Sequence, residues 1–280
     1  MKKTLSSQWN NYELLDAGHD RKLERWGKVI TIRPDRNAYF KPVWGQKKWQ
    51  SLAHFEFIES SSTKGSWVDL GEDFPVNWQI AFGQLHFNLK LTTFKHIGIF
   101  PEQQTNWEFI QRALKSGNRF LNLFGYTGGA SIAARQVGAE VFHIDSVKQI
   151  NAWAKENMDS SGLNDIHWVV EDALKFAKRE VKRGNKYQGI IMDPPAFGLG
   201  AKKERWKIEQ RFPELVEVAS KLLENDGFLI MNTYSPRLKE NDISAIVNEY
   251  FPNKAIDISK LCLKTRTGKT IEYGELTRVT

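Results

Sequence analysis

Strand-like and helix-like segments alternate regularly through the second half of this 280-residue chain. Short apolar runs predict strands, and the segments after them have the 3.6-residue periodicity of amphipathic helices. The expected strands span residues 119–124, 140–145, 167–171, 187–193 and 226–233. The expected helices span about 128–137, 147–160, 172–183, 207–223 and 239–250. This alternation predicts an α/β fold with a mostly parallel sheet and helices on both faces.

Two further β-prone runs, 255–263 and 269–279, are separated by a short Thr-Arg-Thr-Gly turn. They predict a carboxy-terminal hairpin that gives the sheet an antiparallel edge. Earlier in the chain, β-prone runs at 28–32, 54–58 and 85–91 alternate with polar turns. We therefore expect a small amino-terminal β domain, antiparallel in pairing, over residues 1–104, and a second domain over 105–280 that opens with a helix at 105–115.

Composition narrows the class of protein. Seven of the ten tryptophans fall by Trp107, and they either build the core of the β domain or stack on bases. The net charge of +7 is spread along both halves of the chain, which is weaker evidence for nucleic acid than a basic tail. A lone cysteine and scattered histidines exclude an internal disulfide and predict no metal site. Because the chain shows no secretory signal and no membrane-spanning run, we expect a cytoplasmic protein without membrane contact.

The ends of the expected strands carry the residues suited to chemistry. The first strand leads into Gly125-Tyr126-Thr127-Gly128-Gly129, where glycines and the free N–H groups of a helix start can approach a nucleotide or a carboxylate closely. The Gly-x-x-Gly-Gly spacing matches neither the P-loop nor the dinucleotide fingerprint, and a structural strand-to-helix turn stays open as an alternative.

Acidic residues follow the next three strands. Asp145 lies twenty residues past Gly125, the spacing at which a carboxylate takes ribose hydroxyls in nucleotide-binding folds. Asp172 follows the third strand, where an acid could accept from an adenine amino group, and Asp193 follows the fourth. A single strand-end acid is often only a helix cap, but the series predicts an adenosine-containing ligand.

The fourth strand continues into Asp193-Pro194-Pro195-Ala196-Phe197. Two prolines restrict the backbone and remove two donors, so carbonyl groups stand beside an acid and an aromatic ring. These groups suit a planar amine. A Pro-Pro turn that merely ends a strand is the alternative.

The run from residue 120 to 263 resembles a class I S-adenosylmethionine-dependent methyltransferase, most closely the bacterial subgroup that includes large-subunit ribosomal RNA methyltransferases. The matching pieces are LNLFGYTGGAS at 121–131, IDS at 144–146, AKEN at 154–157, EDALKF at 171–176 and DPPAFG at 193–198. An upstream piece, GIFPEQ at 98–103, resembles the segment that family members fold over the methionine end of the cofactor. The resemblance implies a Rossmann-like methyltransferase sheet and S-adenosyl-L-methionine as cofactor.

The resemblance also implies roles for individual residues. Those near the methionine moiety would be Phe100, Gln103, Phe124, Gly125, Tyr126, Thr127 and Gly128. Asp145 and Ser146 would hold the ribose, and Asp172 with Ala173 would border the adenine. Asp193 would lie between the cofactor and the acceptor.

Pro194 and Phe197 would complete the acceptor side with Asp193. Asp193 and the Pro194 carbonyl would accept from an amine while Phe197 stacks on its ring, which predicts methylation at nitrogen. Methylation at pyrimidine carbon-5 needs a thiolate that attacks carbon-6. The segment 231–235 holds no cysteine, and Cys262 lies on an expected hairpin strand, where a buried structural thiol is expected.

The loop at 200–207 carries four cations and Trp206. It offers phosphate contacts and stacking to a nucleic acid, or it is the solvated start of the next helix. Next to the upstream piece, His96 is a further candidate for lining the site.

Three functions follow from these features. The favoured one is an RNA methyltransferase that modifies a base nitrogen, with ribosomal RNA as the preferred substrate. A methyltransferase for a protein side chain or a small planar metabolite is the second, suggested by the diffuse charge and the unfamiliar β domain. The third is a nicotinamide-dependent oxidoreductase or a non-catalytic nucleotide-binding module. The sequence leaves the oligomeric state open.

Overall fold

The structure is a computed structural model that describes residues 2–7, 9–61, 64–71, 74–199 and 205–280. These residues divide into two compact units. The α/β unit contains the chain up to Thr4, residues 105–261 and residues 274–280, and the β unit contains residues 5–104 and 262–273. The predicted domains, 1–104 and 105–280, stay a prediction. The units differ from them in the first few residues and in the 262–273 segment.

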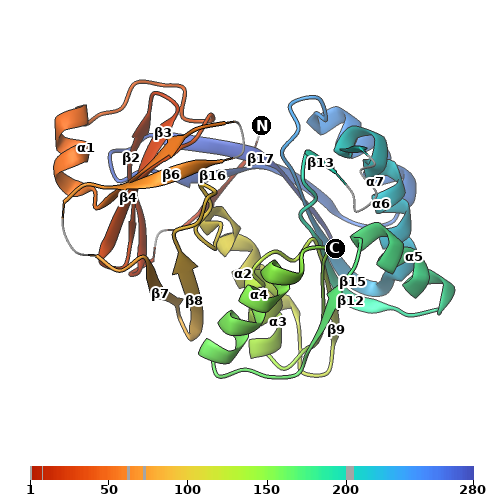
Figure 1. Cartoon of the computed structure of the whole chain (residues 1–280). Coiled ribbons are helices and arrows are strands. Elements are labelled where there is room, and N and C mark those ends of the chain that lie inside the picture. The colour runs from red at the N-terminus through yellow and green to blue at the C-terminus, as the bar shows by residue number, and fades with distance from the viewer. Residues whose placement is uncertain (1, 8, 62–63, 72–73, 200–204) are drawn as a thin grey trace. The chain divides into compact units, whose positions relative to one another are not determined.

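The α/β unit is built on one mixed sheet (Figure 1). Its strand order within the described residues is β1-β16-β17-β15-β12-β9-β10-β11. The strands are β1 Lys3–Ser6, β9 Arg119–Leu123, β10 Glu140–Asp145, β11 Ile166–Val170, β12 Tyr187–Met192, β15 Leu223–Thr233, β16 Ile256–Lys264 and β17 Thr270–Val279. Pairing is parallel from β15 through β12, β9 and β10 to β11, whereas β17 runs antiparallel to β15. The mostly parallel sheet with antiparallel carboxy-terminal strands confirms the predicted fold class.

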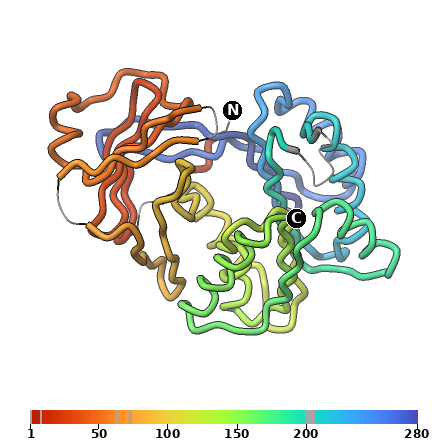
Figure 2. Tube along the Cα trace, in the orientation of Figure 1, coloured from red at the N-terminus to blue at the C-terminus, as the bar shows by residue number. Residues whose placement is uncertain are grey.

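Helices cover both faces of this sheet. They are α2 Gln104–Ala113, α3 Gly129–Gln136, α4 Lys148–Ser160, α5 Ala173–Lys182, α6 Ile208–Leu222 and α7 Glu240–Tyr250. One face packs against α5, α6 and α7 through alternate strand residues such as Leu121, Ile190 and Leu229. The opposite face meets α3, where Asn122 contacts Ser131. Figure 2 shows the green trace of α3 and α4 on one side of the sheet and the blue trace of α6 and α7 on the other.

The β unit contains a sheet in the order β2-β3-β4-β5-β6 and a separate β7-β8 hairpin. Its elements are β2 Tyr12–Gly18, β3 Arg21–Trp26, β4 Val29–Pro34, α1 Gln46–Leu52, β5 Phe55–Glu59, β6 Gly65–Asp69, β7 Asn77–Phe82, β8 Leu85–Lys90 and the short 3-10 helix η1 Pro101–Gln103. The expected antiparallel pairing needs one correction, because β4 and β5 are parallel. Helix α1 lies between them in the chain and supplies the crossover that parallel strands require.

Several tryptophans of the β unit are core residues. Trp26 is fully buried and donates from Nε1 to Thr31 at 3.0 Å, and Trp49 belongs to a cluster with Leu23 and Ile32. Beside Trp26, the buried pair Glu24 and Arg33 is joined by hydrogen bonds of 2.7 and 3.0 Å. The core interpretation is therefore confirmed for Trp26 and Trp49. Among the described residues, no helix is long and apolar enough to cross a membrane.

Candidate cofactor and acceptor site

The candidate site of the α/β unit lies where β9, β10, β11 and β12 end. Backbone hydrogen bonds continue past the strands and tie these ends together: Gly125 N donates to Ile144 O at 2.9 Å, Glu171 N to Asp145 O at 3.2 Å, and Asp193 N to Leu123 O at 3.4 Å. Because neighbouring parallel strands end at the same sheet edge, the glycine-rich turn and the three strand-end acids are brought together.

The glycine-rich turn is held in an uncommon backbone conformation. Phe124 and Tyr126 have φ angles of +62° and +49°, a left-handed region that costs a non-glycine residue about 1–3 kcal/mol. Tyr126 N compensates by donating to Asp145 Oδ2 at 3.0 Å, and Gly128 N donates to Gly125 O at 3.0 Å. Strained backbone that the surrounding contacts over-determine is typical of ligand-binding turns.

Gly125 allows the turn to lie directly on a buried imidazole. A Cβ atom at this position would stand 2.3 Å from His143 Cε1. His143 is fully buried on β10, with Nδ1 2.9 Å from Ser131 Oγ, and Asn122 Nδ2 donates to the same hydroxyl at 2.9 Å. Burial lowers the pKa of His143 to about 3, so the ring is neutral. This network supports the turn from below, and no motif of the sequence predicts it.

Asp145 is bound by the backbone on two sides. Its Oδ2 atom accepts from Tyr126 N, and its Oδ1 atom accepts from Val147 N at 2.9 Å. Burial raises the pKa of this carboxyl, and the two N–H groups oppose that shift. A carboxylate has about four acceptor positions, so it can bind two hydroxyl groups in addition. Its neighbour Ser146 is exposed.

Asp172 serves as the N-cap of α5. Its Oδ1 atom accepts from Lys175 N at 2.8 Å, and Ala173 at the start of the helix is buried. The structure thus places both residues at the expected strand end and also confirms capping, the alternative reading of a strand-end acid. Their contact with adenine stays a prediction.

The segment after Asp193 forms a structured arm that the sequence did not predict. Pro194 is buried, and β13 Phe197–Leu199 pairs antiparallel with β14 Arg205–Lys207. Trp206 Nε1 donates to Pro195 O at 2.7 Å, and its ring lies 5.5 Å from the ring of Phe124. The expectation of a loop over 200–207 is therefore wrong for 205–207, whereas 200–204 lie outside the described residues.

Phe197 is the aromatic side chain that this arm presents to solvent. It is 69% exposed, and Lys207 Nζ lies 6.0 Å from the centre of its ring. An exposed phenyl ring with an ammonium beside it provides a stacking surface and a phosphate contact.

The remaining candidates belong to the β unit. Phe100 precedes η1, Gln103 is buried within it, and the ring of His96 lies 5.0 Å from that of Phe100. Between them Glu102 is buried, and burial raises its pKa to about 7. Cofactor contacts of Phe100 and Gln103, and any role of His96 in lining the site, stay predictions.

Comparison with known proteins identifies the family. Residues 39–233 match the model of the S-adenosylmethionine-dependent methyltransferase family. A solved S-adenosylmethionine-dependent methyltransferase from Agrobacterium tumefaciens is 30% identical, with a TM-score of 0.93 over 100% of this chain and 93% of that one. The chain belongs to this family, whose cofactor is S-adenosylmethionine. The predicted enzyme class and cofactor are confirmed, and the nicotinamide alternative loses its support.

Curated relatives are similar over part of their length. The chain is 32% identical to the ribosomal RNA large subunit methyltransferase K/L of Shewanella frigidimarina over 57% of this chain and 22% of that protein. It is 29% identical to the ribosomal RNA large subunit methyltransferase K of Neisseria meningitidis over 62% of this chain and 49% of that protein. The chain thus matches half or less of the length of these relatives.

Proposed function

We propose that this enzyme transfers a methyl group from S-adenosylmethionine to a nitrogen of a base in RNA, with ribosomal RNA as the favoured substrate. The observation that carries the proposal is the arm after β12. It sets Asp193, the buried Pro194 and the exposed Phe197 directly after the strand that adjoins the glycine-rich turn.

The residues of the strand-end edge fit the cofactor. Phe124 to Gly128 would surround the methionine moiety, in a turn that Gly125 allows to lie directly on the His143 ring. Asp145 with Ser146 would bind the ribose hydroxyls, and Asp172 with Ala173 would border the adenine. The cofactor would supply an electrophilic methyl carbon on a sulfonium.

On the acceptor side, Asp193 and the Pro194 carbonyl would accept hydrogen bonds from an amine while Phe197 stacks on the base. Base–aromatic stacking contributes about 1–3 kcal/mol. The acceptor nitrogen would take the methyl group from the sulfonium, whose sulfur would keep the electrons of the broken C–S bond, and the nitrogen would then lose a proton to Asp193 or to water. Positioning accounts for most of the rate in such a transfer.

RNA as the acceptor is supported by the stacking surface at Phe197 and Lys207 and by the names of the two ribosomal RNA methyltransferases that are similar to this chain. Such a substrate agrees with the cytoplasmic location expected from the sequence. Cys262 is fully buried, which agrees with a structural thiol and with nitrogen rather than carbon-5 as the methylated atom.

The test is methyl transfer from tritiated S-adenosylmethionine to RNA isolated from a strain that lacks the gene. We expect label in the RNA fraction, strongest in large-subunit ribosomal RNA. Calorimetry with S-adenosylhomocysteine on the same preparation shows whether the cofactor site is formed. Unlabelled RNA in a protein that binds S-adenosylhomocysteine would reject RNA as substrate, and label in a protein or metabolite fraction would support the second function.

A further inference from the structure

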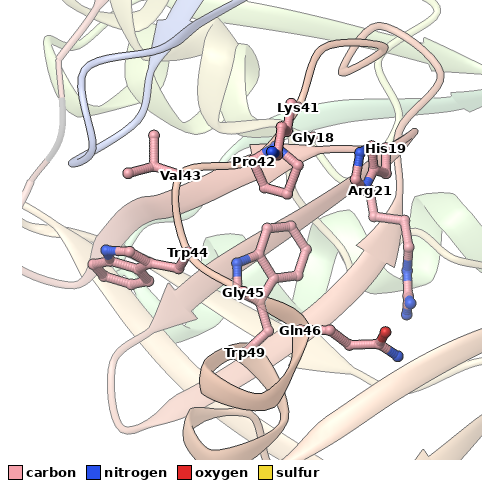
Figure 3. A pocket seen from close by; sticks show the side chains of 10 residues that line it. All are labelled: Gly18, His19, Arg21, Lys41, Pro42, Val43, Trp44, Gly45, Gln46 and Trp49. Carbon is pink, nitrogen blue, oxygen red and sulfur yellow. The ribbon is translucent and has the colours of Figure 1, made fainter.

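The β unit contains a cavity of about 400 Å³ between the end of β2 and helix α1 (Figure 3). Its walls include Trp44 and Trp49 together with the polar side chains of Arg21, Lys41 and Gln46. In Figure 3 the indole of Trp49 lies at the centre of this lining, with Arg21 and Gln46 on one side and Val43 and Trp44 on the other. The volume lies within the range of small-molecule sites, about 300–1,000 Å³.

A buried carboxylate fixes the shape of this cavity. Asp16 is fully buried, and its Oδ2 atom accepts from Trp44 N at 2.7 Å and from Trp49 Nε1 at 3.0 Å. Its Oδ1 atom accepts from Thr267 Oγ1 at 2.7 Å. One charge therefore holds the segment before α1, the helix itself and the tip of the β16–β17 hairpin. Such a wall is formed before any ligand arrives, which lowers the cost of binding.

The chain also passes unusually close to itself at the edge of the cavity. A Cβ atom on Gly18 would stand 2.3 Å from Pro42 N, so a glycine is required where the segment 40–45 crosses the end of β2. This close approach and the anchoring by Asp16 both indicate a built structure rather than an incidental surface hollow.

Cations gather around the aromatic walls. Lys48 Nζ lies 3.8 Å from the centre of the ring of Trp44, which lines the cavity. Outside the lining, Lys269 Nζ on the hairpin tip lies 5.8 Å from the centre of the Phe40 ring. Lys41 is exposed at the rim. Arg21 forms an ion pair with Glu56. The carboxylate of Asp16 is buried, and its oxygens accept the hydrogen bonds described above. The lining and rim thus combine ring faces with positive charge.

We propose that this cavity binds one nucleotide of a single-stranded RNA, with the base against Trp44 and the phosphate at Lys41 and Arg21. Aromatic rings joined with cations are what single-stranded nucleic acids require of a protein, whereas an acidic peptide would use the cations alone. The inference rests on the proposed function for its choice of RNA, and it assigns the β unit a substrate-holding role separate from methyl transfer.

The test measures binding of fluorescein-labelled single-stranded oligoribonucleotides to the full chain by anisotropy, for Lys41→Glu and Trp44→Ala. We expect each variant to bind at least ten-fold more weakly. For Lys41→Glu, the slope of log affinity against log salt concentration should also become shallower by about one. Controls are Lys28→Glu and Phe94→Ala, which alter exposed residues of the same unit outside the cavity lining. They should bind within two-fold of the parent. Lys41 is exposed, so its variant folds even where Trp44→Ala does not.

A second readout locates the RNA. Photo-crosslinking with 4-thiouridine oligonucleotides followed by mass spectrometry should place the crosslink in peptides that contain residues 41–49. The inference would be overturned if both cavity variants bound RNA as tightly as the controls, or if the parent bound no RNA at all. It would also be overturned if the parent bound polyglutamate, a model acidic peptide, in preference to RNA.

The outcome is distinct from that of the methyl-transfer assay. RNA that is methylated equally well by the parent and both cavity variants, with equal affinity, would refute the cavity and leave the proposed function standing. RNA binding that depends on Lys41 and Trp44, without any labelling of RNA, would refute the proposed function and leave the cavity standing as an RNA-binding site.

Discussion

The strand-end edge of the α/β unit and the cavity of the β unit are built in opposite ways. At the strand-end edge, backbone atoms form the surface: left-handed residues at Phe124 and Tyr126 and a glycine that lies on the neutral ring of His143. In the cavity, side chains form the surface, and the buried charge of Asp16 holds them. The strand-end edge, which is built from backbone atoms, should therefore tolerate few changes in the shape of the turn. The cavity, which is built from side chains, should depend mainly on Asp16.

Replacing the acceptor carboxylate should have the largest effect. We expect Asp193→Ala to lower kcat by about a hundred-fold or more, since the acceptor amine loses its orientation, while affinity for S-adenosylhomocysteine stays within a few-fold. Single-turnover kinetics and calorimetry measure the two quantities, and Asp193→Asn serves as the isosteric comparison. Unchanged turnover in Asp193→Ala would remove this residue from the acceptor site.

Removing the Asp16 carboxylate, which holds the cavity together, should have the second-largest effect. Asp16→Ala leaves Trp44 N and Trp49 Nε1 without their acceptor, whereas Thr267 Oγ1 keeps its contact with Thr265 Oγ1. Each unsatisfied buried donor costs about 1–3 kcal/mol. We expect a loss of about 2–3 kcal/mol in the free energy of unfolding by urea and loss of RNA binding, with Asp16→Asn less affected. A variant as stable as the parent would show that the anchoring charge is dispensable.

A methyl group at the cofactor turn should have a smaller effect on stability. Gly125→Ala places Cβ 2.3 Å from His143 Cε1, and overpacking of this kind costs about 1–3 kcal/mol. We expect weaker binding of S-adenosylhomocysteine as the turn shifts, and partial recovery when His143→Ala is added. Gly45→Ala is the matched control, because its Cβ would meet nothing within 4 Å. Equal cofactor affinity in Gly125→Ala and Gly45→Ala would contradict the backbone-built account.

The pH dependence of stability should show the smallest change. Burial raises the pKa of Glu102 to about 7 from its ordinary 4.5, with Lys22, Asp35 and Glu24 nearby. The folded protein keeps a proton that the unfolded chain releases above pH 4.5, so this group lowers stability as pH rises from about 4.5 to 7. We therefore expect Glu102→Gln to stabilise the protein at pH 8 by on the order of 1–2 kcal/mol relative to its effect at pH 5. Urea unfolding at both pH values measures this, and an equal effect at both would place the Glu102 pKa near its ordinary value.

The same contrast explains what could be predicted from the sequence. Strand-helix alternation and strand-end residues are local patterns, so the sheet and the positions of Gly125, Asp145, Asp172 and Asp193 were accessible from the chain alone. Contacts between residues that lie far apart in the sequence could not be predicted in this way. The pairing of His143 with Ser131 and Asn122 joins three separate elements, and nothing in their spacing indicates it.

Elements with weak periodicity were missed for a related reason. Helix α1 buries only Trp49 among its seven residues, so it lacks the apolar stripe that predicts a helix. The three-residue strands β13 and β14 are too short for alternation to be recognised. Asp16 and Thr267 meet across 251 positions of sequence, and for that reason the cavity could not be predicted from motifs.

Methylation of a base nitrogen that depends on Asp193 is tested most directly by mass spectrometry of nucleosides from large-subunit ribosomal RNA, purified from a strain lacking the gene and treated with the enzyme and S-adenosylmethionine. We expect one added nucleoside whose extra methyl group is on a base nitrogen, present with the parent enzyme and absent with Asp193→Ala. A methyl group on pyrimidine carbon-5, or the same nitrogen product formed equally well by Asp193→Ala, would contradict it.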